Sequence, residues 1–204
     1  VSVNGGVPVR TGTVSGGVWS INNVTAFAGD VLTVFVSDVP DNEEAVGVFV
    51  YDGLGDMTGV ELYQGHLSLA ADETATTTIA DLAQGDNNAI GDEDVFFAVD
   101  GSSNVTLCAS GACENNSLYI GTNNVFVPDN ASGRTITMHD FVNDGTIELD
   151  SNTLEVSGSW SNNGSVASDL STIAMNATST TETMTDSSGT IALHDVTFGD
   201  SGTA

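Results

Sequence analysis

Lysine is missing from this chain of 204 residues, and Arg10 and Arg134 are its only permanently cationic side chains, against 28 Asp and Glu residues. The formal net charge is -26. Nucleic acid backbones and anionic membrane surfaces are bound by clustered Lys and Arg, so the sequence excludes both as partners. The missing lysine also excludes Schiff-base chemistry and a P-loop.

Long apolar runs are missing as well, and we expect no membrane insertion. Charged residues make up only 15% of the chain, so its hydrophilic surface must consist largely of Ser, Thr, Asn and Gly, which favour turns over helices. The chain starts at Val1 rather than at Met, which indicates a processed chain or a piece of a longer one. These features predict a secreted, all-β protein.

Short β-branched runs bounded by Gly, Asn or Asp fill the chain, and almost none has a helical period. Residues 76–84 have Ile79, Leu82 and Ala83 on one side, as in a helix, but their threonines favour extended structure equally. Four runs predict a small antiparallel β-sandwich over residues 1–52, and these are 1–9, 18–26, 31–36 and 45–51.

Residues 53–204 predict a β-solenoid-like region, because their short runs are each followed by a Gly, Asn or Asp corner. The segment 135–140, Thr-Ile-Thr-Met-His-Asp, recurs at 190–195 as Thr-Ile-Ala-Leu-His-Asp. A repeat of this kind favours a coil with one continuous core, and an antiparallel sandwich is the alternative. The repeat predicts that Ile136 and Ile191 occupy equivalent inward positions on two levels of the coil, and that Met138 and Leu193 do the same.

Residues 152–165 read Asn-Thr-Leu-Glu-Val-Ser-Gly-Ser-Trp-Ser-Asn-Asn-Gly-Ser, a Ser/Thr-rich stretch continues to Thr178, and residues 194–198 read His-Asp-Val-Thr-Phe. This succession resembles a unit of very large, repetitive surface proteins of environmental bacteria, and residues 59–64 and 108–113 are similar to what precedes that unit. The resemblance implies an extracellular, adhesin-like or fibre-forming protein, built from a β-solenoid joined to immunoglobulin-like sandwiches. It supplies no catalytic residues.

Calcium is the cofactor that the sequence suggests, although none is required for the fold we expect. The loop from Asp86 to Asp94 places oxygen ligands at relative positions 1, 3, 7 and 9, with Gly91 at position 6. Phe97 stands at position 12, where a calcium loop has an acidic residue, and a solvated acidic loop is the alternative. The candidate ligands are Asp86, Asn88, Asp92 and Asp94, and a weaker second set is Asp52, Asp56 and Glu61.

Cys108 and Cys113 are the only cysteines, and Ala-Ser-Gly-Ala separates them. A local disulfide fits this spacing in an oxidising compartment, and two reduced thiols are the alternative. Six sequons indicate glycan modification: Asn23, Asn104, Asn115, Asn130, Asn163 and Asn176.

Catalytic motifs are weak, and we expect no enzymatic activity. Ser201 lies in a Gly-Asp-Ser-Gly sequence like that of a protease nucleophile loop, but no matching His context accompanies it, and a polar turn explains it. The neighbours His139-Asp140 and His194-Asp195 would point to opposite faces of a strand and so would not hydrogen-bond to each other. We expect the larger aromatic side chains to be core anchors: Trp19, Trp160, Phe35, Phe49, Phe96 and Phe97.

The N-terminal segment 1–9 is uncharged and alternates Val with small or polar residues, a pattern suited to an edge strand. Donation of this strand to a neighbouring copy would build a head-to-tail homo-oligomer, with Val1, Val3, Val7 and Val9 as the contact residues. The alternative is that it forms the first strand of its own domain. We therefore expect a structural protein that forms or decorates a cell-surface filament, with a calcium- or carbohydrate-binding adhesin module as the alternative function.

Overall fold

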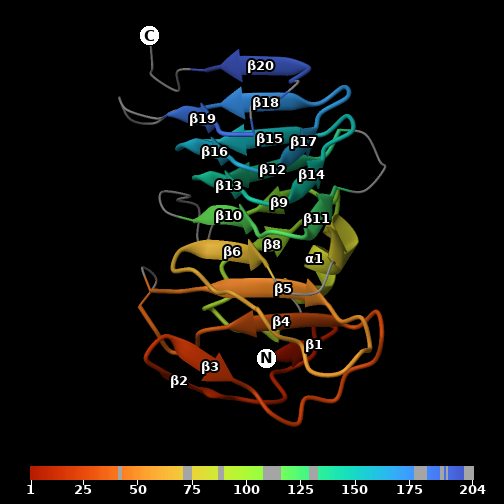
Figure 1. Ribbon diagram of the computed structural model, residues 1–204, viewed down its shortest axis with the longest axis vertical. Coiled ribbons are helices and arrows are strands. Elements are labelled where there is room, and N and C mark those ends of the chain that lie inside the picture. The colour runs from red at the N-terminus through yellow and green to blue at the C-terminus, as the bar shows by residue number, and fades with distance from the viewer. Residues whose placement is uncertain are drawn as a thin grey trace.

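The computed structural model describes residues 1–40, 43–70, 75–86, 90–107, 116–128, 133–176, 183–188, 191 and 193–199. In these residues the chain is all-β apart from one short helix. Its strands lie across the long axis of the molecule and follow one another along it, with the N-terminus near one end and β20 at the other (Figure 1).

Three large sheets contain every described strand except β2 and β3, which form a fourth sheet of two strands, and most strand pairs in the large sheets are parallel. The first sheet contains β1 (Ser2–Val3), β4 (Val31–Phe35), β5 (Val46–Val50), β6 (His66–Leu69), β10 (Ser117–Ile120), β13 (Phe141–Asn143), β16 (Trp160–Asn162) and β19 (Met184–Asp186), in that order. The second contains β7 (Ala75–Thr78), β11 (Asn124–Val127), β14 (Thr146–Glu148) and β17 (Ser165–Ala167). The third contains β8 (Ala98–Val99), β9 (Val105–Thr106), β12 (Thr135–Met138), β15 (Thr153–Val156), β18 (Thr172–Met175) and β20 (Asp195–Phe198).

From β10 to β18 the chain visits the sheets in a fixed order, first, second and third, and begins again one level further along the axis, and β19 and β20 then extend the first and third sheets. We call these strands, together with β6, β7 and β9, the parallel stack. Each turn places equivalent inward side chains directly above one another. In the first sheet, Leu118, Phe141, Trp160 and Met184 are register partners.

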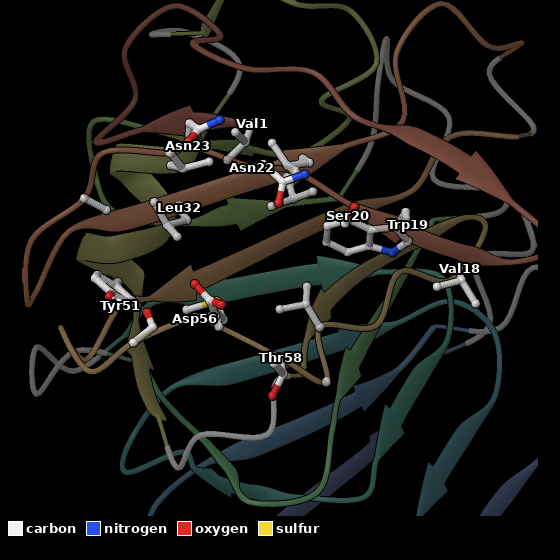
Figure 2. A pocket seen from close by; sticks show the side chains of 18 of the residues that line it. Val1, Val18, Trp19, Ser20, Asn22, Asn23, Leu32, Tyr51, Asp56 and Thr58 are labelled. Carbon is white, nitrogen blue, oxygen red and sulfur yellow. Dashed lines mark hydrogen bonds between the residues drawn. The ribbon is translucent and has the colours of Figure 1, made fainter.

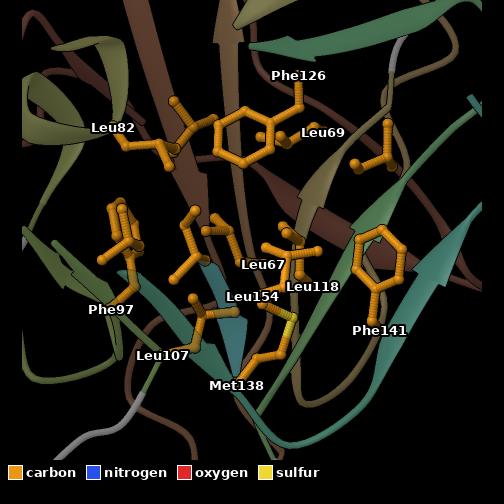
Figure 3. Packing of buried hydrophobic residues seen from close by; sticks show 14 of the residues in the cluster. Leu67, Leu69, Leu82, Phe97, Leu107, Leu118, Phe126, Met138, Phe141 and Leu154 are labelled. Atoms are coloured by element: carbon orange, nitrogen blue, oxygen red, sulfur yellow. The ribbon is translucent and has the colours of Figure 1, made fainter. Parts of the chain in front are cut away.

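One continuous core fills the space between the three sheets (Figure 3). The third sheet contributes a second column of register partners, Ile136, Leu154, Ile173 and Val196, and the second sheet contributes Phe126, Ile147 and Val166. Side chains in the middle of these columns are fully buried. Short strands suffice here because every level buries its apolar residues against the levels on both sides.

Stacked Asn and Gly residues form the corner between the first and second sheets. Asn143 donates from Nδ2 to Asn162 Oδ1 at 2.7 Å, and Asn162 donates in turn to Asp186 Oδ1 at 2.8 Å. Two residues later a Cβ on Gly164 would overlap the carbonyl oxygen of Gly145. The Asn-x-Gly spacing therefore satisfies buried polar groups and allows the backbones of successive turns to approach closely.

The seven-residue helix α1 (Ile79–Gly85) begins directly where β7 ends. Thr78 caps it: its hydroxyl accepts from the Asp81 backbone N–H, and the Asp81 carboxylate accepts from the Thr78 N–H. This capping box satisfies two amide groups at the helix start. The threonines thus form the strand, and Ile79 and Leu82 form the buried side of the helix.

The first sheet continues across the expected domain boundary at residue 52. Strand β5 pairs in parallel with β6 at Val46 and Leu67, and both residues are fully buried in the same core. The other face of β4 and β5 carries a second apolar cluster, whose buried members include Leu32 and Phe49. A separate hairpin of β2 (Thr13–Ser15) and β3 (Val18–Ser20) contributes to its cover.

The 55-residue sequence repeat does not correspond to the structural register. Ile136 and Met138 face inward as expected, but their equivalents at the last level are Val196 and Phe198. Ile191 precedes β20 and is only partly buried. The expectation that Ile136 and Ile191 are equivalent was therefore wrong, because the turns differ in length and no fixed sequence period follows the coil.

Candidate assembly surfaces

A groove opens beside the second apolar cluster, with a volume of about 580 Å³ (Figure 2). Its floor is made by Leu32 and Val34 of β4, and Trp19 and Tyr51 line it from two different segments. The Tyr51 hydroxyl donates to the Gly55 carbonyl oxygen at 2.6 Å, which holds the turn at one wall. Volumes of this order are typical of binding sites in proteins, about 300–1,000 Å³.

Most of the large apolar side chains that are exposed in the described residues lie in the N-terminal part of the chain. Val18, on the same hairpin as Trp19, has 74% of its surface exposed. Among the described residues, six of the nine large apolar residues that are exposed lie before residue 55, and these are Val7, Val9, Val14, Val18, Phe27 and Leu54. Contiguous exposed apolar surface marks interaction sites in soluble proteins.

Charge is distributed unevenly between the two ends of the chain. Residues 1–29 contain no Asp or Glu, whereas the average composition would give about four in a segment of this length. Arg10 is the single charged side chain of this segment, and its guanidinium donates to the carbonyl oxygens of Val9 and Asn23. We call residues 1–29 the acid-free layer. It is the longest segment of the chain without a carboxylate. An acidic partner bound to this segment would meet no negative side chain within it.

At the opposite end of the stack, no further strand pairs with the outer edges of three strands within the described residues. Strands β17, β19 and β20 are the last members of their sheets. In β20, Asp195 N–H donates to the Ser171 carbonyl oxygen, and Gly199 N–H donates to that of Met175. Because alternate residues of a parallel strand bond to opposite sides, the N–H groups of Val196 and Phe198 point away from β18. We call β17, β19 and β20 the open end.

The core is also uncovered at the open end. Val166, Met184 and Val196 are only partly buried, although they continue columns whose inner members are fully buried. Phe198 belongs to the column of Val156 and Met175, and 76% of its surface is exposed. Such an end would pair with further backbone if a partner supplied it.

The expected calcium ligands are engaged in other bonds where the structure describes them. Asp86 is buried and accepts from the Val99 N–H at 3.3 Å. Asp94 accepts from the Asp38 N–H at 2.6 Å, and its own N–H donates to Asp92. Burial first, and the nearby Asp94 carboxylate next, raise the pKa of Asp92. Asn88 lies outside the described residues.

No group of three or more His, Cys, Asp or Glu side chains arranged to hold a metal occurs in the described segments. The weaker set of Asp52, Asp56 and Glu61 is exposed, and Glu61 accepts a hydrogen bond from the Tyr63 hydroxyl at 3.0 Å. Cys108 and Cys113, the expected disulfide, lie outside the part of the chain that the structure describes.

Both His-Asp pairs bring their side chains closer together than alternation along a strand would allow. His139 Nδ1 lies 3.2 Å from Asp140 Oδ1, and His194 Nδ1 lies 3.2 Å from Asp195 Oδ2. The side chains approach because both histidines stand at bends, where neighbouring side chains do not alternate as they do within a strand. The Asp140 carboxylate also accepts from the Ser159 N–H, so this pair joins two levels of the stack.

The expected donor strand pairs within its own chain over its first residues. Ser2 and Val3 form β1, antiparallel to β4, and Val1 is buried in the second apolar cluster. Val7 and Val9 are exposed.

The expected aromatic anchors divide into two groups. Trp160, Phe49, Phe96 and Phe97 are buried, and Phe35 packs partly buried against the core. Trp19 instead lines the groove, a position that we did not predict from the sequence. The signal that could have found it is the acid-free composition around it, together with the Gly16-Gly17 turn of its hairpin.

The sequons differ in how their side chains are used. Asn104 donates to the Asp100 carboxylate and accepts from the Thr135 N–H, and Asn163 donates to Asp144. Asn23 is exposed beside the groove. Its amide is therefore the most accessible of these three to a modifying enzyme.

Comparison with protein-family models, with curated proteins and with solved structures returned no match for this chain. Within the described segments, no helix combines the length and the apolar character that a membrane span requires.

Proposed function

We propose that this protein is a secreted structural protein whose copies join end to end into a filament at the cell surface. The observation that carries the proposal is the difference between its two ends. Residues 1–29, which carry no acid, lie at one end of the long axis, and β17, β19 and β20, the last strands of their sheets among the described residues, lie at the other (Figure 1).

An end-to-end arrangement is favoured over a closed pair because the two surfaces are unlike. A contact between unlike surfaces is heterologous, and it builds an open filament unless its rotation happens to close a ring. Association along the axis would also bury Phe198 and the N–H groups of Val196 and Phe198, which point away from β18. The strongly acidic remainder of each copy would keep neighbouring filaments apart.

The architecture that we propose for this function is a β-solenoid formed by the parallel stack, preceded by a small sandwich-like cap. The cap consists of β4 and β5 with the β2–β3 hairpin on their outer face. It has fewer strands than the about seven of an immunoglobulin-like domain. The resemblance to repetitive bacterial surface proteins agrees with a role outside the cell.

Sedimentation velocity over a range of protein concentrations tests the proposal, with electron microscopy of the same samples. We expect assemblies that lengthen with concentration and with salt, because salt screens the repulsion between copies. Thin filaments one molecule wide would support end-to-end growth. A protein that remains monomeric at high concentration and high salt would contradict it.

A further inference from the structure

Two of the three tyrosines lie against each other on the outer face of the first sheet. Tyr119 stands on β10 between Leu118 and Ile120, which both face the core, so its own ring faces outward. The ring of Tyr63, in the segment before β6, lies against it, with 4.8 Å between ring centroids and 80° between their planes. Among the described residues, no other ring contact joins two tyrosines.

Backbone hydrogen bonds hold both rings in place. At the turn that leads into β6, the His66 N–H donates to the Tyr63 carbonyl oxygen at 3.0 Å. The Ser117 N–H donates to the Gly65 carbonyl oxygen at 2.8 Å, which joins this turn to β10. Strands β6 and β10 are parallel neighbours in the first sheet (Figure 1). The two rings therefore come from successive levels of the stack and are 56 positions apart in sequence.

Each of the two hydroxyls donates to a carboxylate of its own. Tyr63 donates to Glu61 Oε2 at 3.0 Å, and Tyr119 donates to Asp144 Oδ2 at 3.1 Å. The other carboxylate oxygen of Asp144 accepts from Asn163 Nδ2 at 2.9 Å, which fixes its orientation. Burial first, and these carboxylates next, raise the pKa of both tyrosines, so both hydroxyls are protonated at neutral pH. Each phenol thus touches a base that can take its proton when the ring loses an electron.

The pair is accessible to an oxidant in solution. Tyr63 has 42% of its surface exposed, and Tyr119 is half-buried behind it. An oxidant can take an electron from Tyr63, and electron exchange between the touching rings can pass the radical on to Tyr119. Tyrosine radicals couple through the ring carbons next to the hydroxyl, and the joined rings are twisted against each other. The steep angle between these two rings is therefore compatible with the coupled product.

We propose that Tyr63 and Tyr119 form an oxidative cross-linking site, at which a haem peroxidase and hydrogen peroxide join the two rings into dityrosine. Each phenol loses one electron to the peroxidase and one proton to its carboxylate partner, which releases the proton to water. The two radicals form one carbon–carbon bond, and the hydrogen on each bonded carbon then moves to the phenolic oxygen. The protein loses two hydrogen atoms in total, and one hydrogen peroxide is reduced to two waters. The cross-link lies within one chain and does not depend on end-to-end assembly.

The test treats the full chain with a haem peroxidase and hydrogen peroxide at low micromolar protein concentration. Dityrosine is measured by its blue fluorescence, and mass spectrometry of the digested protein identifies the joined residues. Tyr63→Phe and Tyr119→Phe each remove one partner and keep a ring in place. Tyr51→Phe is the matched control, because Tyr51 is the third tyrosine and its hydroxyl donates to the Gly55 carbonyl oxygen instead. Circular dichroism checks that each variant is folded.

We expect the wild type and Tyr51→Phe to give a peptide that joins Tyr63 to Tyr119, while the protein stays monomeric on a denaturing gel. Tyr63→Phe and Tyr119→Phe should lose this product. The fractional yield should not depend on protein concentration, because the reaction joins two groups that one fold already holds together. The cross-link closes a long loop, so it should raise the melting temperature by about 5–10 °C.

The two carboxylates are positioning residues whose role is tested by rate. Glu61→Gln and Asp144→Asn keep the size of the side chain and remove the base, so each should slow the cross-linking without changing which residues are joined. Rates equal to that of the wild type would show that the carboxylates take no part.

Three results would overturn the inference. Dityrosine found only between chains, as dimers on a denaturing gel, would show that the paired rings do not react with each other. Equal yields within the chain from the wild type and Tyr63→Phe would place the reaction elsewhere. If no dityrosine forms under conditions that couple free tyrosine, the contact between the two rings is one of packing alone.

Discussion

The indole ring of Trp160 lies against the phenyl ring of Phe141 one level below it, with 4.3 Å between ring centroids and 38° between their planes. The two residues are 19 positions apart in sequence and are direct register partners. Their contact fixes how two successive turns of the stack are placed. The Trp160 Nε1 hydrogen has no acceptor among the described residues, so the ring stabilises the core through its apolar area alone.

Truncation of this aromatic column should destabilise the whole stack. We expect Trp160→Ala to lower the free energy of unfolding by about 3–5 kcal/mol, because it leaves a large cavity at a fully buried site. Trp160→Phe should cost less than about 1.5 kcal/mol, since it keeps a ring and removes the unpaired N–H group. Urea denaturation measures both values. Equal losses for the two variants would mean that the indole N–H has an acceptor.

A methyl group on Gly164 should also destabilise the fold. The new Cβ would overlap the Gly145 carbonyl oxygen on the turn below, which is backbone and cannot rotate away. We expect Gly164→Ala to cost about 1–3 kcal/mol, as over-packing does. Gly101→Ala is the matched control, because a Cβ there meets no atom within 4 Å. Thermal unfolding compares the two, and similar melting temperatures would show that the corner is not closely packed.

Tyr119 should titrate abnormally. Burial first, and the Asp144 carboxylate next, raise its pKa, and its hydroxyl donates to Asp144 Oδ2 at 3.1 Å. The folded protein thus holds this proton at a pH where the unfolded chain, with a pKa of about 10, has lost it. Stability should therefore fall as pH rises above about 10.

Asp144→Asn tests this assignment. Without the carboxylate, the pKa of Tyr119 should decrease, and the tyrosinate absorbance should rise at a lower pH than in the wild type. Tyr119→Phe identifies which step of the titration belongs to this residue. If Asp144→Asn leaves the titration curve unchanged, burial alone raises the pKa.

Salt should stabilise both the fold and the assembly, because 28 acids on this chain repel one another unless they are screened. The screening length falls from about 30 Å at 0.01 M salt to about 3 Å at 1 M. We expect the melting temperature to rise over this range and filaments to loosen in a chelator at low salt. Filaments that are indifferent to both would contradict this.

Measurements at matched ionic strength distinguish specific calcium binding from general screening of the negative charge. A rise in melting temperature with calcium, but not with sodium chloride at the same ionic strength, would indicate a specific site. Asp92→Asn should then remove the calcium effect if the Asp86–Asp94 loop binds the ion, whereas Asp56→Asn should remove it if the weaker set does.

Thiol titration in denaturant, without a reductant, checks the prediction that Cys108 and Cys113 are bonded. We expect no free thiol, since a five-residue spacing with a glycine permits a local bridge. Two free thiols would indicate the reduced alternative.

The positions of several strands could be predicted from the sequence. Residues 31–36 and 45–51, identified from short apolar runs, contain β4 and β5. Their partners could not be predicted in the same way. The repeated Thr-Ile-x-x-His-Asp segment suggested a period, but Ile136 pairs with Leu154, and the last turn places Val196 rather than Ile191 in that column. Register depends on the lengths of the loops between strands, which the apolar pattern does not record.

For the assembly surfaces, too, the composition could be predicted from the sequence, whereas the positions of the side chains could not. The acid-free composition of residues 1–29 is a property of the sequence, and so is the overall charge. The position of Trp19, which lines a groove while it packs partly buried against the second apolar cluster, depends on how the hairpin packs over the outer face of β4 and β5. Phe198 has the same alternating context as buried residues, and only its place at the end of the stack leaves it uncovered.

The sequence by itself determined that this protein is all-β, strongly acidic and built from short strands with Gly and Asn corners, because these properties depend on composition and on local backbone preference. The tertiary structure alone decided which strands stack, where the core ends and which apolar side chains stay exposed. Burial depends on neighbours that are distant in sequence, and in a stack each level is covered only by the levels next to it. The last described level therefore exposes the same kinds of residue that the inner levels bury.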